Sequence, residues 1–252
     1  MLYNERAELI LQQLQLQSTV KVNELSQLLQ VSVDTVRRDL KAMEQAGLIK
    51  CLRGGACLPE SHLSLSNFKG REVINSELKR ETVRKALRYI KAGDIIAMNS
   101  GTTNTILAQE MLALNEPITV VTNNFAAANV LMQSQAIKII LIGGDLDALE
   151  QSTCGAGCEQ EFSRYFPDVC FLSINAVNYK DGFTDFRLAE IPVIQLLAGV
   201  SRQVIAVMDS SKLGKCSKKK VFGPESVDIL LMDDHIPQEI RKKYQDKGYR
   251  IE

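Results

Sequence analysis

Residues 31–56 read VSVDTVRRDLKAMEQAGLIKCLRGGA, and this stretch decides the fold of the N-terminal region. Ser32 is a suitable N-cap, because its hydroxyl can accept a hydrogen bond from a main-chain N–H of the helix that follows. The apolar stripe of that helix is formed by Val33, Val36, Leu40 and Met43. Gly47 is typical of a helix end. Residues 48–57 then form two short segments around Arg53-Gly54-Gly55, a pattern that predicts a tight hairpin.

Two further helices are predicted upstream of this stretch. The first has apolar residues at helical spacing, namely Ala7, Ile10, Leu11 and Leu14. The second is shorter and is marked by Val22, Leu25, Leu28 and Leu29. Three helices followed by a hairpin predict a winged helix-turn-helix, a DNA-binding domain, over residues 1–57.

The third helix and the hairpin carry the candidate DNA-binding residues. These are Ser32, Asp34, Thr35, Arg37, Arg38, Lys41, Lys50 and Arg53. Arginine can read guanine in the major groove through two hydrogen bonds, and lysine or threonine can hold phosphates. An ordinary helical bundle with a solvated charged face would show similar charges. The inference therefore depends on the helix spacing, the serine cap and the hairpin together.

Composition limits the possible partners and cofactors. The 252 residues carry a formal net charge of zero, so a DNA-binding surface must be a local basic patch. The apolar runs are too short for a membrane span, and the first residues do not resemble a secretory signal, so we expect a cytoplasmic protein. Two histidines and the lack of C-x-x-C predict no metal and no cofactor. Cys154 and Cys158 are either a redox pair or small residues in a turn, and reduced thiols are normal in the cytoplasm.

The remainder of the chain divides into a linker and a larger domain. Residues 58–76 lack periodicity and are predicted to be a linker. In residues 77–252, apolar runs alternate with helical stretches, which predicts an α/β domain with a mostly parallel, doubly wound sheet. The six runs are residues 94–99, 118–123, 137–144, 169–175, 203–209 and 227–234.

Each run ends in asparagine, glycine or aspartate. Open α/β sheets bind ligands beyond the carboxyl ends of their strands, so these positions are candidates for a ligand site. The stretch Asn99-Ser100-Gly101-Thr102-Thr103 lies between a predicted strand and a predicted helix, where free N–H groups and hydroxyls favour a phosphate. A capped helix start without a ligand would look the same. Other predicted strand ends carry Asn123, Gly143, Gly144, Asp209 and Lys212. The last two could bind sugar hydroxyls and phosphate, or pair with each other.

These motifs resemble the DeoR family of repressors over about residues 5 to 250. The stretch at residues 31–56 is similar to the family's N-terminal signature, with Thr35, Arg37 and Arg38 on the recognition helix. The later motifs resemble its sensor domain, which is itself similar to ribose-5-phosphate isomerase. The resemblance implies a repressor of a carbohydrate-utilisation operon that binds double-stranded operator DNA as a homodimer or homotetramer. It also implies that residues 100–103 hold the phosphate of a sugar-phosphate effector.

Three positions depart from the family pattern. Asn99 stands where the family usually has aspartate, and Asn175, also a candidate effector-binding residue, stands at a strand end that often carries aspartate. Ile194 occupies the lysine position of an E-x-x-V-K pattern. Two carboxylates and one cation are therefore missing, which implies a ligand that is less anionic or differently hydroxylated.

The alternative function is a sugar-phosphate isomerase with an appended DNA-binding domain. Such an enzyme needs a carboxylate base near the substrate carbonyl. The isomerase resemblance places that base within the apolar stretch PVIQLL at residues 192–197, about one helical turn from Glu190. We therefore expect a regulator and not an enzyme.

Overall fold

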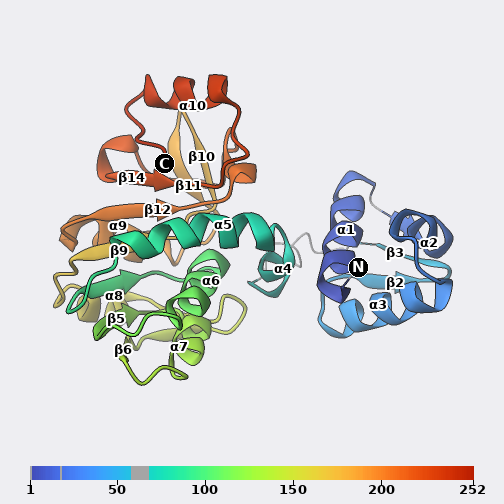
Figure 1. The fold of residues 1–252 in the computed structure, drawn as a ribbon, viewed down its shortest axis with the longest axis horizontal. Coiled ribbons are helices and arrows are strands. Elements are labelled where there is room, and N and C mark those ends of the chain that lie inside the picture. The colour runs from blue at the N-terminus through green and yellow to red at the C-terminus, as the bar shows by residue number, and fades with distance from the viewer. Residues whose placement is uncertain (1, 18, 58–67) are drawn as a thin grey trace. The chain divides into compact units, whose positions relative to one another are not determined.

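The computed structural model describes residues 2–17, 19–57 and 68–252 (Figure 1). The chain forms two compact units, residues 1–76 and residues 77–252. Part of the predicted linker, residues 58–67, lies outside the described residues. The rest of it contains a helix, α4 (Phe68–Val73), which contacts α1 (Tyr3–Leu16) and buries Phe68. The last part of the predicted linker is therefore ordered, because an apolar anchor ties this segment to the first unit.

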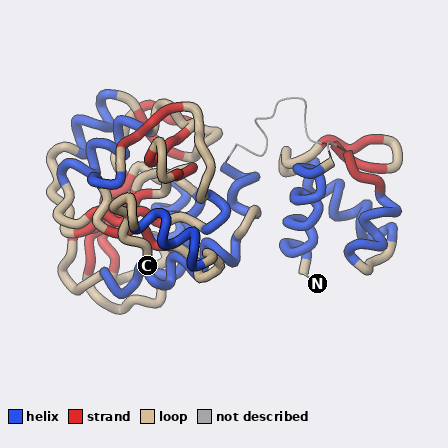
Figure 2. The backbone as a smooth tube through the Cα atoms, turned by 90° about the horizontal axis from the view of Figure 1, so that it is seen from above, coloured by secondary structure: helices blue, strands red, loops and turns tan. Residues whose placement is uncertain are grey.

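The first unit is a winged helix. After α1, its elements are β1 (Thr19–Lys21), α2 (Val22–Leu29), α3 (Val33–Gln45), β2 (Lys50–Leu52) and β3 (Gly55–Cys57). The three strands form an antiparallel sheet in the order β1-β3-β2. Figure 2 shows these strands in red to one side of the blue helices. The predicted helices and hairpin are present, and β1 is an addition to them. Leu28 faces outward, whereas the other predicted apolar positions on α2 are buried.

Two adjacent glycines serve different purposes in the wing. Gly54 has a φ of 86°, a left-handed conformation that favours glycine at a hairpin turn. Gly55 lies against β1, where a Cβ atom would be only 2.1 Å from the main-chain oxygen of Val20. The first glycine therefore closes the β2–β3 turn, and the second lets β3 approach β1.

An ion pair fixes α1 against α3. The guanidinium of Arg6 donates to both carboxylate oxygens of Asp39, at 2.6 and 2.9 Å. Asp39 is 5% exposed although it carries a charge. A carboxylate at this depth is tolerated because the paired guanidinium satisfies both of its oxygens.

The second unit contains a six-stranded parallel sheet. Its strands are β4 (Ile95–Met98), β5 (Ile118–Thr122), β6 (Ile137–Leu141), β9 (Val169–Leu172), β12 (Val204–Val207) and β14 (Ile229–Leu231). They lie in the order β14-β12-β9-β4-β5-β6, and all pairings between neighbours are parallel. All six correspond to the predicted apolar runs, which confirms the predicted fold class. The chain reverses its direction of winding between β4 and β9, so a ligand crevice is expected there.

Helices cover both faces of this sheet (Figure 1). One face packs against α5 (Ser76–Ala86), α6 (Thr102–Met111) and α7 (Phe125–Leu131). The other packs against α8 (Ala156–Phe162) and α9 (Ile191–Val200). Neighbouring residues of one strand enter different cores, as Ile96 and Ala97 of β4 do. Burial on both faces explains why the strands read as continuous apolar runs.

Smaller elements complete the second unit. The β7 (Asp145–Asp147) and β8 (Ser152–Cys154) strands form a hairpin. The antiparallel sheet β10-β11-β13 consists of β10 (Ala176–Asn178), β11 (Gly182–Asp185) and β13 (Lys219–Phe222). The remaining elements are α10 (Gln238–Gln245) and three 3-10 turns, η1 (Leu87–Tyr89), η2 (Ser210–Lys212) and η3 (Pro224–Ser226). The antiparallel sheet was not predicted.

The two wing glycines should respond differently to substitution. We expect Gly55→Ala to lower the free energy of unfolding of the first unit by about 1–3 kcal/mol, because its Cβ meets the β1 main chain. Gly54→Asn is the control and should cost less than about 1 kcal/mol, since asparagine tolerates the left-handed region and open space surrounds Gly54. Chemical denaturation of the full-length chain measures both. Equal losses would show that β1 does not pack on β3 as described.

Candidate functional site

The first candidate site is the exposed face of α3 with the wing. Ser32 caps α3, because its Oγ accepts a hydrogen bond from the Thr35 main-chain N–H at 3.2 Å. The two hydroxyls also lie 2.9 Å apart. Thr35 is half-buried, and the remaining predicted contacts are exposed, namely Asp34, Arg37, Arg38, Lys41, Lys50 and Arg53. Asp34 pairs with Arg37 at 3.4 Å on the surface, where such a pair is weak and can be exchanged for a phosphate.

The second candidate site lies beyond the carboxyl ends of β4 and β9. Asn99, directly after β4, is fully buried and bridges to the loop after β9. Its Oδ1 accepts from the Ser173 N–H at 2.7 Å, and its Nδ2 donates to the Ser173 carbonyl at 3.1 Å. Gly101 lies where a Cβ would be 2.5 Å from the Ser173 Oγ. The two loops therefore meet at the point where the direction of winding reverses.

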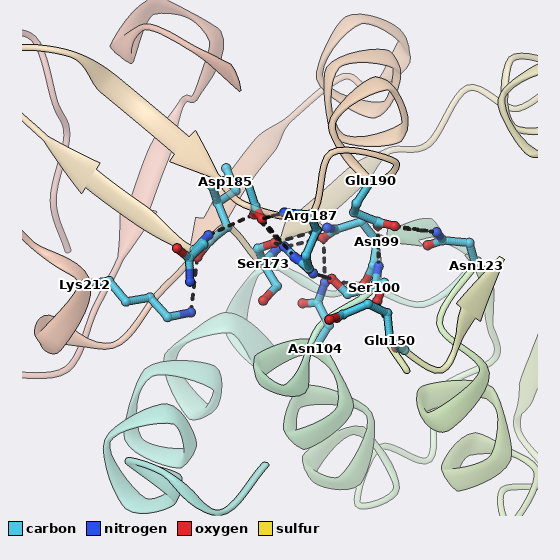
Figure 3. Close-up of polar contacts among 12 residues, drawn as sticks. Asn99, Ser100, Asn104, Asn123, Glu150, Ser173, Asp185, Arg187, Glu190 and Lys212 are labelled. Carbon is cyan, nitrogen blue, oxygen red and sulfur yellow. Dashed lines mark hydrogen bonds and ion pairs between the residues drawn. The ribbon is translucent and has the colours of Figure 1, made fainter. Parts of the chain in front are cut away.

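A buried arginine holds this junction together (Figure 3). Arg187, in the segment between β11 and α9, is 8% exposed. Its guanidinium donates to the carbonyls of Ser100 and Ser173, at 2.8 Å each. It also donates twice to Asp185, at 3.0 and 2.7 Å. Although burial alone raises the pKa of Asp185, the charge and hydrogen bonds of Arg187 bring it below its ordinary value. Asp185 is therefore a carboxylate, and the pair is neutral overall.

A second carboxylate lies on the other side of the junction. Glu190 is 4% exposed, and its Oε1 accepts from the main-chain N–H of Ser100 at 2.9 Å. Asn123, after β5, donates from Nδ2 to Glu190 Oε2 at 3.1 Å and to the carbonyl of Thr153 at 2.7 Å. Burial raises the pKa of Glu190 to about 7, against the lowering effects of Arg187, the Ser100 N–H and Asn123. Glu190 therefore changes charge near neutral pH.

A cleft of about 220 Å³ opens beside these two residues. It is bounded by the β7–β8 hairpin and by residues 186–190, and Arg187 and Glu190 are among its lining residues. The hairpin contributes two further acids to the lining, Asp147 and Glu150. The lining therefore carries several carboxylates and one guanidinium, which is itself paired with Asp185.

The predicted effector residues occupy different parts of this edge. Thr102 and Thr103 are buried in the first turn of α6, and the Thr103 hydroxyl has no hydrogen-bond partner among the described residues. Asp209 is buried 4.0 Å from Lys212, whose ammonium donates to the carbonyl of Ile174 at 3.1 Å. A chain of polar contacts thus runs from Lys212 to Asn123 along the sheet edge (Figure 3). It passes through Asn175, whose main-chain N–H donates to Asp185 at 3.0 Å.

Three positions singled out in the sequence lie elsewhere. Gly143 and Gly144 are exposed, and a Cβ at Gly144 would be 2.5 Å from the carbonyl oxygen of Cys154. Gly144 is therefore explained by a close approach between chain segments. Ile194 is fully buried in the apolar core beneath α9.

The two cysteines of the C-x-x-x-C motif have no sign of an activated thiol. Burial raises the pKa of the Cys158 thiol to about 11 and also raises that of Cys154, which favours the turn interpretation over a reactive redox pair. Within residues 2–17, 19–57 and 68–252, no group of three or more histidine, cysteine or acidic side chains could hold a metal ion. No helix in those ranges is long and apolar enough to cross a membrane.

Sequence reasoning missed Arg187, Asp185 and the actual position of Glu190. Glu190 was expected to lie to one side of the site, yet its carboxylate reaches the Ser100 N–H. Asp185 ends β11 and the other two residues follow it. Because β11 belongs to the small antiparallel sheet, the rule that ligands bind at the carboxyl ends of parallel strands did not predict these residues. The available signal was the sequence DFR at residues 185–187, in which an acid and a base lie two residues apart.

Comparisons with known proteins identify both units. Residues 6–62 match the model of the DeoR-like helix-turn-helix domain, and residues 74–234 match that of the DeoR C-terminal sensor domain. The chain is 31% identical to the transcriptional regulator GolR of Listeria innocua, over 98% of this chain and 97% of that protein. It is 31% identical to the repressor GlcR of Bacillus subtilis, over 92% and 89% of the two chains.

Further similarities are weaker. The chain is 28% identical to the glycerol-3-phosphate regulon repressor of Escherichia coli, over 94% of this chain and 93% of that protein. Among solved structures, ribose 5-phosphate isomerase A of Neisseria gonorrhoeae aligns with a TM-score of 0.40 and 17% identity, covering 54% of this chain and 53% of that chain.

The amide of Asn99 can be tested by converting it to the acid that the family pattern carries. We expect Asn99→Asp to destabilise the second unit by about 1–3 kcal/mol, because the donor to the Ser173 carbonyl is lost in a buried site. Burial and that carbonyl should raise the pKa of the new carboxyl above its unfolded value. The folded state then binds more protons, so the variant should lose stability as pH rises through that pKa.

Thermal unfolding between pH 5 and pH 8 measures this effect, with the wild-type chain as reference. A variant that is as stable as the wild type at every pH would contradict the bridging role of Asn99.

Proposed function

The chain belongs to the DeoR family of DNA-binding transcriptional regulators, and we propose that it represses a carbohydrate-utilisation operon under the control of a sugar phosphate or a related metabolite. It acts in the cytoplasm on double-stranded operator DNA. The observation that carries the effector half of this proposal is the buried Ser100–Thr103 loop at the junction of β4 and β9.

The DNA half of the proposal assigns roles to the exposed cations of the first unit. Arg37, Arg38 and Lys41 project from the solvent face of α3, whose other face is buried in the winged-helix core. A recognition helix in the major groove uses such side chains to read bases. Lys50 and Arg53 lie on the β2–β3 hairpin and contact the phosphate backbone. Their exposure supports these roles, because a charged side chain can contact DNA only if it is accessible on the protein surface.

The effector half assigns the phosphate to the start of α6. Helix N-termini attract anions because their first N–H groups lack partners within the helix. The Thr103 hydroxyl lies in the same turn, is buried and has no partner among the described residues. The relatives also support a sugar-related effector, because one is named for the glycerol-3-phosphate regulon.

Two further features belong to this proposal. We infer that the protein works as a homodimer or homotetramer, because one winged helix covers too little DNA for a specific operator and two half-sites require two copies.

We also infer that it is not an enzyme. The buried Glu190 would resemble a general base, but its carboxylate is occupied by Ser100 and Asn123. A coupled assay with several sugar phosphates tests the alternative of an isomerase.

The recognition helix and the wing should contribute differently to DNA binding. Arg38→Ala should weaken operator binding by about 1–3 kcal/mol and relax specificity at one base pair. Arg53→Ala and Lys50→Ala should each lower the salt slope by about one unit with little change in sequence preference. Fluorescence anisotropy with operator and random duplexes, at several salt concentrations, separates the two effects. An equal loss on both duplexes for Arg38→Ala would reassign that arginine to the backbone.

The effector site is tested by two substitutions in the loop. Gly101→Val places a side chain against Ser173 and Arg187 and should abolish induction while leaving operator binding intact. Thr103→Val keeps the side-chain shape and removes a hydroxyl that has no partner among the described residues, so stability should be unchanged and effector affinity should fall. Release of labelled operator by a panel of sugar phosphates, with the matching unphosphorylated sugars as controls, measures induction. A normal response in both variants would place the pocket elsewhere.

A further inference from the structure

The carboxylate of Glu190 occupies a position that an anionic ligand would need. Ser100 lies in the loop that leads from β4 into α6, and its main-chain N–H donates to Glu190 Oε1 at 2.9 Å. Asn123 adds a second donor to the same carboxylate, at 3.1 and 3.3 Å to its two oxygens. A carboxylate that receives a loop N–H and a side-chain amide is bound as an external anion would be.

The surroundings of Glu190 make its charge unfavourable. The only guanidinium in the site, Arg187, directs its donors to Asp185 and to the carbonyls of Ser100 and Ser173 among the hydrogen bonds described. Asp185 and Glu150 add negative charge nearby, and the charge of Glu190 in turn contributes to the raised pKa values of the Cys154 thiol on β8 and the Cys158 thiol on α8. Burial outweighs the favourable contacts, so the pKa of Glu190 stands at about 7.

We propose that Glu190 is a built-in competitor for the anionic group of the effector: its carboxylate holds the Ser100 N–H in the ligand-free protein and releases it, by taking up a proton, when that group binds. This inference rests on the proposed function, which places a phosphate at residues 100–103. A phosphate dianion beside an ionised Glu190 would put two anions against the same donors in a poorly solvated site. A proton taken from solvent neutralises Glu190 and turns its carboxyl from an acceptor into a donor.

Proton uptake makes anion affinity depend on pH in a definite direction. Below the pKa of Glu190 the proton is already present, and affinity is at its highest. Above that pKa, the binding of each anion requires the uptake of one proton from solvent by Glu190, so affinity falls by about tenfold for each further pH unit. The site therefore selects for an anion and senses acidity through a single side chain.

Inorganic sulfate is a suitable probe, because its charge stays constant over the relevant pH range. Calorimetric titration of the full-length protein between pH 6 and pH 9, in buffers of different ionisation enthalpy, gives the affinity and the number of protons taken up. For the wild type we expect an uptake approaching one proton at pH 8 and affinity that falls as pH rises. Glu190→Gln retains an oxygen that can accept from Ser100, so it should bind sulfate about tenfold more tightly than wild type at pH 8 and show no pH dependence.

Glu150→Gln is the matched control, because it removes a nearby carboxylate whose side chain is not the acceptor of the Ser100 N–H. It should keep the wild-type pH dependence. Weaker binding by Glu190→Gln, or wild-type binding without proton uptake, would overturn the competitor role while leaving the anion site in place. Absence of sulfate binding in the wild type and in both variants would overturn the anion site and the competitor together. The number of protons that the wild type takes up on sulfate binding tests the competitor role even if Glu190→Gln does not fold.

Discussion

The buried ion pair between Arg187 and Asp185 is the interaction on which the candidate effector site depends. The guanidinium joins three chain segments, because it donates to carbonyls after β4 and after β9 and to a carboxylate at the end of β11. Loss of one partner from such a pair costs about 3–5 kcal/mol, because the other charge stays buried. An apolar substitute could fill the space, but it could not orient two carbonyl groups. The pair therefore contributes geometry to the site more than it contributes stability.

The loop at Ser100 is contacted by two opposite charges. Its carbonyl faces the cation of Arg187, and its N–H faces the carboxylate of Glu190. The peptide groups on the two sides of Ser100 are thus oriented by two opposite charges. Both charges, Arg187 and Glu190, lie on the short segment between β11 and α9. This arrangement orients the main chain that leads into α6. Gly101, with a φ of 143°, supplies the backbone conformation that permits it.

The parts of the molecule that the sequence could predict are those whose signals are local. The six parallel strands follow from continuous apolar runs, and α3 follows from the Ser32 cap and its apolar stripe. Arg187 and Asp185 could not be found in this way, since their partners lie up to 87 residues away in the chain. The same limit applies to β1, whose pairing with β3 joins Val20 to Ala56. The assignment of Gly143 and Gly144 to the effector site stays a prediction, and at Gly144 the close approach of the Cys154 carbonyl is a second reason for glycine.

The three departures from the family pattern differ in their effect on the charge of the site. Asn99 uses both ends of its amide on Ser173, so an aspartate would bring a charge and lose a donor. Asn175 contributes a main-chain N–H to Asp185, and this acid is already balanced by Arg187. Ile194 packs in the apolar core, so at this position the isoleucine removes no cation from the described site. Glu190 differs from Asp185 in its response to burial: Arg187 brings the pKa of Asp185 below its ordinary value, whereas burial still outweighs Arg187 at Glu190. The electrostatic preference of the site thus depends on the protonation of Glu190 more than on the three substitutions.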